Sequence, residues 1–203
     1  MGDGRTARAE RTRELRRRQI LDSSLEVFSE KGYWNTSISD LVRAAGVARG
    51  TFYLYFDSKQ AIFLDLLGEL VDRLRGVIKG VDPTAGASVD VQLRAIVVRI
   101  LETTADNQHL TRIVFREAVG LDAEVEARLT SFYDELRAYL VHALELGVAL
   151  GLVRESVDRE TTAACMLGAL RGVVQRYIVD HDDPFDPEAV ADSVVQFVVG
   201  GIR

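Results

Sequence analysis

A short segment near the amino end carries side chains suited to hydrogen bonding inside a groove. The polar side of a helix predicted here faces outward, while Phe52 and Phe56 can anchor its other side in a core. Five residues share that outer face and are either hydrogen-bonding or permissive for close backbone approach: Arg49, Gly50, Thr51, Tyr53 and Tyr55. An isolated helix this short is unstable in water, so a packed scaffold must hold it.

The amino terminus is also rich in arginine. Residues 1–18 hold seven arginines, at positions 5, 8, 11, 13, 16, 17 and 18. Residues 1–59 carry 11 Lys or Arg and 8 Asp or Glu, whereas residues 60–203 carry 14 and 23, so a basic end adjoins an acidic remainder. Because salt screens charges beyond about 10 Å, the basic end can meet a polyanion locally. A solvated, disordered arm without a role is the alternative for residues 1–10.

Composition excludes several classes of protein. The chain has 203 residues, 47% of them apolar, which is enough for one or two domains with a core, and its three prolines favour helices. No charge-free apolar stretch is long enough to cross a membrane, and the basic start is not followed by the apolar run of a signal peptide. We therefore expect a soluble, cytoplasmic protein without a membrane partner. The lone Cys165 excludes an internal disulfide and a multi-thiolate metal site, and we expect no metal and no cofactor.

Helical periodicity and turn residues organise the first 59 positions. A helix is predicted from about 12 to 31, where Ile20, Leu21, Ser24, Leu25 and Phe28 form one stripe before Gly32 ends it. The sequence 36–40, Thr-Ser-Ile-Ser-Asp, resembles a helix N-cap, so a second helix should run to Ala45 and stop at Gly46. A third helix is expected over 48–55. Two short helices joined through a glycine and clamped by a longer one match a helix-turn-helix unit.

The rest of the chain has helical patterns throughout. Further helices are predicted over residues 58–79, 88–105, 108–119, 122–150, 159–180 and 188–199. The expected fold is therefore all-α, with a three-helix domain over 1–59 and a larger helical domain over 60–203.

The last two predicted helices favour association with a second copy. One ridge carries Ala164, Gly168 and Gly172 at intervals of four, although each glycine inside a helix costs about 1 kcal/mol relative to alanine. Close approach of another helix would offset that cost, and the final helix offers a narrow apolar stripe containing Val190, Val194 and Phe197. A symmetric four-helix interface between two copies is the prediction. Intramolecular packing of both helices is the alternative.

The stretch from Ile20 to Lys59 resembles the DNA-binding domain of TetR-family bacterial transcription regulators. The resemblance rests on about forty positions, which include Gly32-Tyr33, Thr36-Ser37-Ile38, Ala45-Gly46-Val47, Arg49-Gly50-Thr51-Phe52-Tyr53 and Ser58-Lys59. It implies an all-helical homodimer, usually a repressor, that reads a palindromic operator and is released from DNA by a small molecule. The identity of that effector is not implied.

The resemblance also assigns roles to residues. It implies that Arg49, Gly50, Thr51 and Tyr55 face the major groove, and that Thr36, Ser37, Tyr53 and Lys59 contact phosphates. Arginine can bind guanine O6 and N7 together, while hydroxyl and ammonium groups suit phosphates. Two departures from the family pattern are Ala48, where a serine is frequent, and Tyr55, where a histidine is common. Arg5 and Arg8 are the residues expected to reach an adjacent minor groove.

A mainly hydrophobic effector would require an apolar cavity among the helices near 88–180. Polar residues on these otherwise apolar segments are the candidates to line it: His109, Arg112, Arg116, Tyr133, Tyr139, His142, Cys165 and Gln175.

Two other functions are alternatives to a ligand-responsive regulator. An enzyme using Cys165 as nucleophile is disfavoured, because the sequence lacks HExxH, GxSxG, Walker and dinucleotide motifs and Cys165 lies in an apolar context. A DNA-binding regulator that needs no ligand, with the large domain serving only dimerisation, is the remaining alternative.

Overall fold

A computed structural model describes residues 3–78, 80–82, 84–117 and 123–202, with helices and no strand among them. The chain divides into two compact units, Met1–Leu70 and Val71–Arg203. This division falls eleven residues after the boundary predicted at position 59, because the next helix contributes to the first core. Phe63 of that helix packs against Phe28 and Tyr33, with ring centroids 6.4 and 5.3 Å away.

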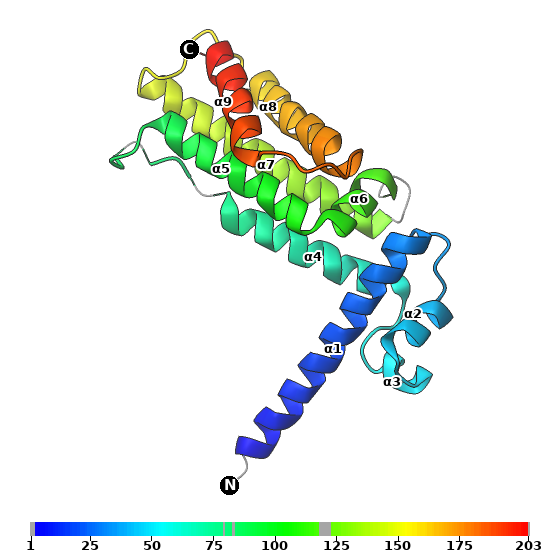
Figure 1. The fold of residues 1–203 in the computed structure, drawn as a ribbon. Coiled ribbons are helices and arrows are strands. Elements are labelled where there is room, and N and C mark those ends of the chain that lie inside the picture. The colour runs from blue at the N-terminus through cyan, green and yellow to red at the C-terminus, as the bar shows by residue number, and fades with distance from the viewer. Residues whose placement is uncertain (1–2, 79, 83, 118–122, 203) are drawn as a thin grey trace. The chain divides into compact units, whose positions relative to one another are not determined.

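The first unit contains α1 (Asp3–Lys31), α2 (Ile38–Ala45), α3 (Arg49–Tyr53) and the start of α4 (Lys59–Val77) (Figure 1). Its core gathers aromatic and aliphatic side chains from all four helices, including the fully buried Ile20, Phe28, Leu41, Phe52 and Phe63. Helix α1 begins nine residues earlier than predicted. The predicted start marked where apolar periodicity begins, whereas the arginine-rich segment before it is helical without a core beneath it, as arginine's high helix propensity permits.

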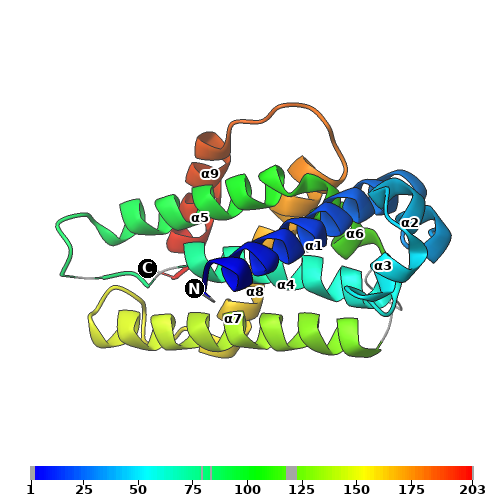
Figure 2. The ribbon, with the colours of Figure 1, turned by 90° about the horizontal axis from the view of Figure 1, so that it is seen from below.

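The second unit contains α5 (Val89–Asp106), α6 (Gln108–Glu117), α7 (Ala123–Ala149), α8 (Arg159–Val174) and α9 (Pro187–Ile202). Within it, α5 packs against α9 and α7 packs against α8 (Figure 2). The helix predicted over 159–180 ends in a π-helix, η1 (Gln175–Val179). The last positions of the helix predicted over 108–119 lie outside the described residues.

A buried cluster joins α5, α8, η1 and α9 of the second unit. Leu101 on α5 packs with Val174, Ile178 and Val179 of α8 and η1, and Val190 of α9 lies against them. No helix in the described part of the chain is long and apolar enough to cross a membrane.

Candidate functional site

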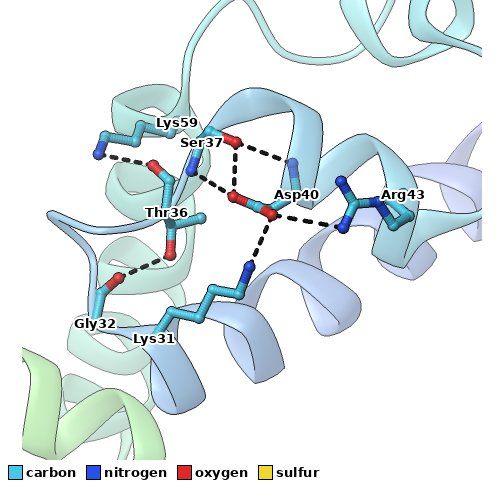
Figure 3. A network of polar contacts seen from close by, with 7 residues as sticks. All are labelled: Lys31, Gly32, Thr36, Ser37, Asp40, Arg43 and Lys59. Carbon is cyan, nitrogen blue, oxygen red and sulfur yellow. Dashed lines mark hydrogen bonds and ion pairs between the residues drawn. The ribbon is translucent and has the colours of Figure 1, made fainter.

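A capping box fixes the start of α2. The Ser37 hydroxyl oxygen accepts a hydrogen bond from the Asp40 backbone N–H at 3.2 Å, and the Ser37 backbone N–H donates to Asp40 Oδ2 at 3.0 Å (Figure 3). Lys31 Nζ lies 2.7 Å from Asp40 Oδ1. The pKa of the Asp40 carboxyl is held well below its usual range, mainly by the hydrogen bond from Lys31 and to a smaller extent by those from Ser37. The exposed Ser37 therefore sits at a rigid helix start.

A left-handed glycine sets the turn between α2 and α3. Gly46 has φ of 62° and its N–H donates to the Arg43 carbonyl oxygen at 3.2 Å, which ends α2. Ala48 then occupies the N-cap of α3 without a side-chain hydrogen bond. Ala48 lacks the hydroxyl that the family pattern often has at this position, and α3 accordingly begins without a side-chain cap.

The exposed face of α3 presents an arginine and a tyrosine that support one another. Arg49 and Tyr53 are one turn apart, with Arg49 Nη2 at 3.4 Å from the Tyr53 hydroxyl and its guanidinium carbon 5.7 Å from the ring centroid. Gly50 between them is exposed, and a Cβ built on it would meet no atom within 4 Å. Thr51 and Tyr55 are half-buried. This face can approach a groove closely and place a guanidinium in it.

Two of the residues predicted to contact phosphates have hydrogen-bond partners within the protein. Thr36 is 3% exposed, and its hydroxyl donates to the Gly32 carbonyl oxygen at 2.7 Å. Lys59 Nζ donates to the Tyr33 carbonyl oxygen at 2.8 Å. It also donates to the Thr36 carbonyl oxygen at 3.0 Å, as Figure 3 shows. Both residues therefore hold the α1–α2 loop, which carries the N-cap Ser37.

A groove that sequence reasoning missed lies beside α3. It has a volume of about 710 Å³ and is lined by residues of α1 and of the segment after α3: Arg8, Ala9, Thr12, Arg13, Leu54 and Tyr55. Leu54 is 74% exposed. Arg5, which was expected to reach a minor groove, has a side chain outside the described residues.

In the second unit, two of the predicted effector residues hold η1. Arg112 Nε donates to the Ile178 carbonyl oxygen at 3.1 Å, and Arg116 Nη2 donates to the Val179 carbonyl oxygen at 2.7 Å. The last carbonyls of a helix lack partners within it, and the α6 arginines supply them. Their place on α6 therefore serves the contact between α6 and η1.

The other predicted effector residues do not converge on one cavity. His109, His142 and Cys165 are exposed, while Tyr133, Tyr139 and Gln175 are half-buried. Burial raises the pKa of the Tyr139 hydroxyl. A groove of about 420 Å³ in this unit is lined by none of the eight predicted residues; its lining includes the carboxylates Glu102, Asp106 and Asp183.

A cluster around Arg171 was also missed. Its guanidinium carbon lies 5.0 Å from the Phe115 ring centroid and 5.7 Å from that of Tyr133, whose hydroxyl oxygen accepts from Nη1 at 3.2 Å. The cluster joins α6, α7 and α8. In the sequence, Arg171 stands next to Gly172 and far from its two aromatic partners. No local pattern around Arg171 therefore predicts this cluster.

The residues predicted for a dimer interface fall into two groups. Ala164, Gly168, Gly172 and Phe197 are exposed, Phe197 by 71%, and a Cβ on either glycine would meet nothing within 4 Å. Val190 and Val194 are half-buried, and Val190 packs on the core cluster. No close approach within the described part of this protomer accounts for the two glycines.

Comparison with known sequences supplies the family. Residues 20–66 match the profile of bacterial regulatory proteins of the tetR family, and residues 86–202 match that of the tetracyclin repressor-like C-terminal domain. The chain belongs to the TetR family. Members of this family are DNA-binding transcriptional regulators and not enzymes, and they act as dimers that bind small-molecule effectors. The predicted family and all-α fold are confirmed.

The chain is similar over most of its length to several family members. The fatty acid metabolism regulator protein of Bacillus subtilis is 26% identical, with 91% of this chain and 94% of that protein covered. The transcriptional activator FasR of Mycolicibacterium smegmatis is 26% identical, with 94% and 84% covered. The structure of the fatty acid degradation regulator FadR from Bacillus halodurans superposes with a TM-score of 0.71 at 27% identity, covering 93% of this chain and 96% of that one.

Proposed function

We propose that this TetR-family regulator represses transcription as a cytoplasmic homodimer on an inverted-repeat operator and is released by a small, mainly hydrophobic effector. The observation that carries the proposal is the exposed face of α3, where Arg49 is held against Tyr53 beside the uncovered Gly50. An arginine placed in this way can bind guanine O6 and N7 together.

The proposed contact surface differs from the one implied by resemblance alone. Arg49, Gly50, Thr51, Tyr53 and Tyr55 remain on it, with Ser37 at the start of α2. We assign Thr36 and Lys59 to positioning the α1–α2 loop, because their polar atoms are bonded to backbone carbonyl oxygens.

Two copies are needed for useful affinity. Helix α3 has five residues and can reach only a few base pairs. A symmetric pair of such helices favours an inverted repeat with half-sites about one helical turn, or slightly more, apart.

We propose a long acyl chain as the hydrophobic part of the effector. Two relatives at 26 and 27% identity are named for fatty acid metabolism and fatty acid degradation. The guanidinium of Arg171, flanked by Phe115 and Tyr133, is suited to an anionic head group, whereas the carboxylate-lined groove is not.

Selection of binding sites from random duplexes tests the DNA function. The selected sequences should be inverted repeats, and Arg49→Ala should cost about 1 to 3 kcal/mol on them and blur the preference at one base pair of each half-site. Arg99→Ala, which removes an exposed arginine from the second unit, is the matched control and should bind like the wild type. Failure to select any sequence at low salt would refute the proposal.

Three compounds test the effector class: palmitate, octanoate, which has a shorter chain, and hexadecanol, which has the long chain but no carboxylate. Palmitate should raise the melting temperature and weaken operator binding between about 5-fold and 150-fold, the range of typical allosteric coupling. Arg171→Ala should reduce both effects, whereas Arg176→Ala should not. A regulator that binds the operator equally well with all three compounds would support the ligand-independent alternative.

A further inference from the structure

We propose that the exposed amino-terminal part of α1, residues 6–16, binds the sugar–phosphate backbone of duplex DNA beside the half-site that α3 contacts. We call this segment the arginine helix. The inference rests on the proposed DNA function and adds to it a second contact surface, formed by a different helix.

The arginine helix has no core of its own to explain its conformation. Every residue from 6 to 16 is exposed, and the first fully buried residue of α1 is Ile20. In Figure 1 this part of α1 projects past α2 and α3 of the same unit. A helix in this position presents its side chains to solvent, where a partner can reach them.

The arginines of α1 divide into two groups by their partners. Just after the arginine helix, Arg17 pairs with Asp65 and Arg18 with Glu69, both on α4, and Arg18 also pairs with Asp22 of α1 itself. Arg8, Arg11 and Arg13 have no acidic partner among the residues that the structure describes. Of the three, Arg8 and Arg13 line the groove beside α3, and it is their charge that is available there to an external anion.

The charges also segregate by helix face. With about 3.6 residues per turn, Arg8, Thr12 and Arg13 share one side of the helix, and all three line the 710 Å³ groove. Glu10 and Glu14 fall on the opposite side, away from the groove. Arg11 lies outside the groove lining, on another side of the same helix.

The chemistry of the groove fits a nucleic-acid backbone. Two guanidinium groups can bind successive phosphate oxygens, and such contacts do not depend on base sequence. Ala9 and the exposed Leu54 offer an apolar surface to deoxyribose. Leu54 and Tyr55, which line the groove, come immediately after the end of α3 at Tyr53, so a DNA strand in the groove would lie next to the DNA at α3.

The test compares two variants on the selected operator with ten flanking base pairs on each side. Arg8→Ala combined with Arg13→Ala should lower affinity roughly five-fold per lost contact near 0.15 M salt, and should flatten the log–log salt dependence by about 0.9 per contact. Because a dimer loses four contacts, the slope should fall by roughly 3 to 4. Base preference should not change. Arg11→Ala is the matched control and should retain both the slope and the affinity of the wild type.

Hydroxyl-radical footprinting locates the contact. The wild type and Arg11→Ala should protect backbone positions outside the half-sites, and the double variant should lose that protection while keeping the protection within them. All three proteins should melt at similar temperatures, because the substituted side chains are exposed.

Several results would overturn the inference. If the salt dependence of affinity has the same slope for the double variant and the wild type, Arg8 and Arg13 do not contact the DNA backbone. A wild-type affinity that changes with A·T or G·C flanks, while that of the double variant does not, would place the arginines in the minor groove. Salt-sensitive self-association lost only in the double variant, with unchanged DNA binding, would assign the segment to a protein partner. In each case Arg49→Ala still reports separately on the DNA function itself.

Discussion

Arg112 on α6 and Ile178 in η1 are joined by a hydrogen bond of 3.1 Å from the guanidinium Nε to the carbonyl oxygen. The same arginine donates to the His181 carbonyl oxygen at 3.0 Å and pairs with Asp182 at 2.6 Å. A single side chain thus connects α6 to the end of η1 and to the residues that follow it.

Arg112→Ala should lower the free energy of unfolding by about 1 to 3 kcal/mol, because carbonyl oxygens of η1 and the following loop lose a charged donor. Thermal and urea unfolding measure this loss. Arg128→Ala, at an exposed position of α7, is the control and should change stability by less than about 0.5 kcal/mol. An unchanged stability of Arg112→Ala would show that the connection contributes nothing.

Lys59→Ala separates a phosphate contact from a positioning role. Because the ammonium is bonded to the carbonyl oxygens of Tyr33 and Thr36, its loss should destabilise the first unit by about 1 to 3 kcal/mol. The slope of operator affinity against salt should stay unchanged. If the slope instead falls by about one while the melting temperature holds, Lys59 contacts a phosphate as the family resemblance implied.

Local signals in the sequence predicted the elements of the first unit well. The N-cap at Ser37 fixes the start of α2 and Gly46 fixes its end, and both lie next to the helix in the sequence. The predicted end at Ala45 is confirmed. Of the predicted stripe on α1, Ile20, Leu21, Ser24 and Phe28 are buried and Leu25 is half-buried. These features depend on neighbours within four or five positions, which a single sequence displays.

The internal partners of polar side chains were not predictable in the same way. Thr36 and Lys59 were assigned to phosphates, yet each bonds a carbonyl oxygen whose position depends on the packed loop. Arg112 bonds a residue 66 positions away. Many acceptors are available to a polar side chain, and the tertiary fold determines which of them lies within hydrogen-bond distance. The π-helical end of α8 depends on such contacts too.

Asp40 should make the first unit sensitive to acid. Its folded pKa lies below the unfolded value of about 3.9, so its stabilising contribution is present above that pH and is lost as the pH falls further towards the folded pKa. Asp40→Asn should therefore melt below the wild type at pH 7, and the difference should narrow by pH 3. Glu26→Gln, an exposed change on α1, should show no such gap at either pH. A gap that stays constant would exclude the carboxylate as its cause.

Phe197→Asp tests the proposed interface between two copies. The side chain is 71% exposed in the protomer, so a charge there should leave the fold intact but disfavour burial against a second copy. At micromolar concentration the variant should sediment as a monomer, while Val91→Asp, a similar change at an exposed valine of α5, should sediment as a dimer. A dimeric Phe197→Asp would place the interface elsewhere.

Gly168→Leu distinguishes a helix that faces only solvent from a helix that packs against a second copy, because the substitution should be favourable in the first case and unfavourable in the second. A Cβ at this position meets nothing within 4 Å in the protomer, so in a helix facing only solvent the change should raise the free energy of unfolding by about 0.5 to 1 kcal/mol through helix propensity. In a helix that a second copy approaches closely, the added side chain should clash and weaken dimerisation. We expect the second result, a dissociation constant raised at least about ten-fold, equivalent to about 1.4 kcal/mol, as measured by sedimentation across a concentration series. Higher stability with an unchanged dissociation constant would mean that the ridge through Gly168 and Gly172 is not where the two copies meet.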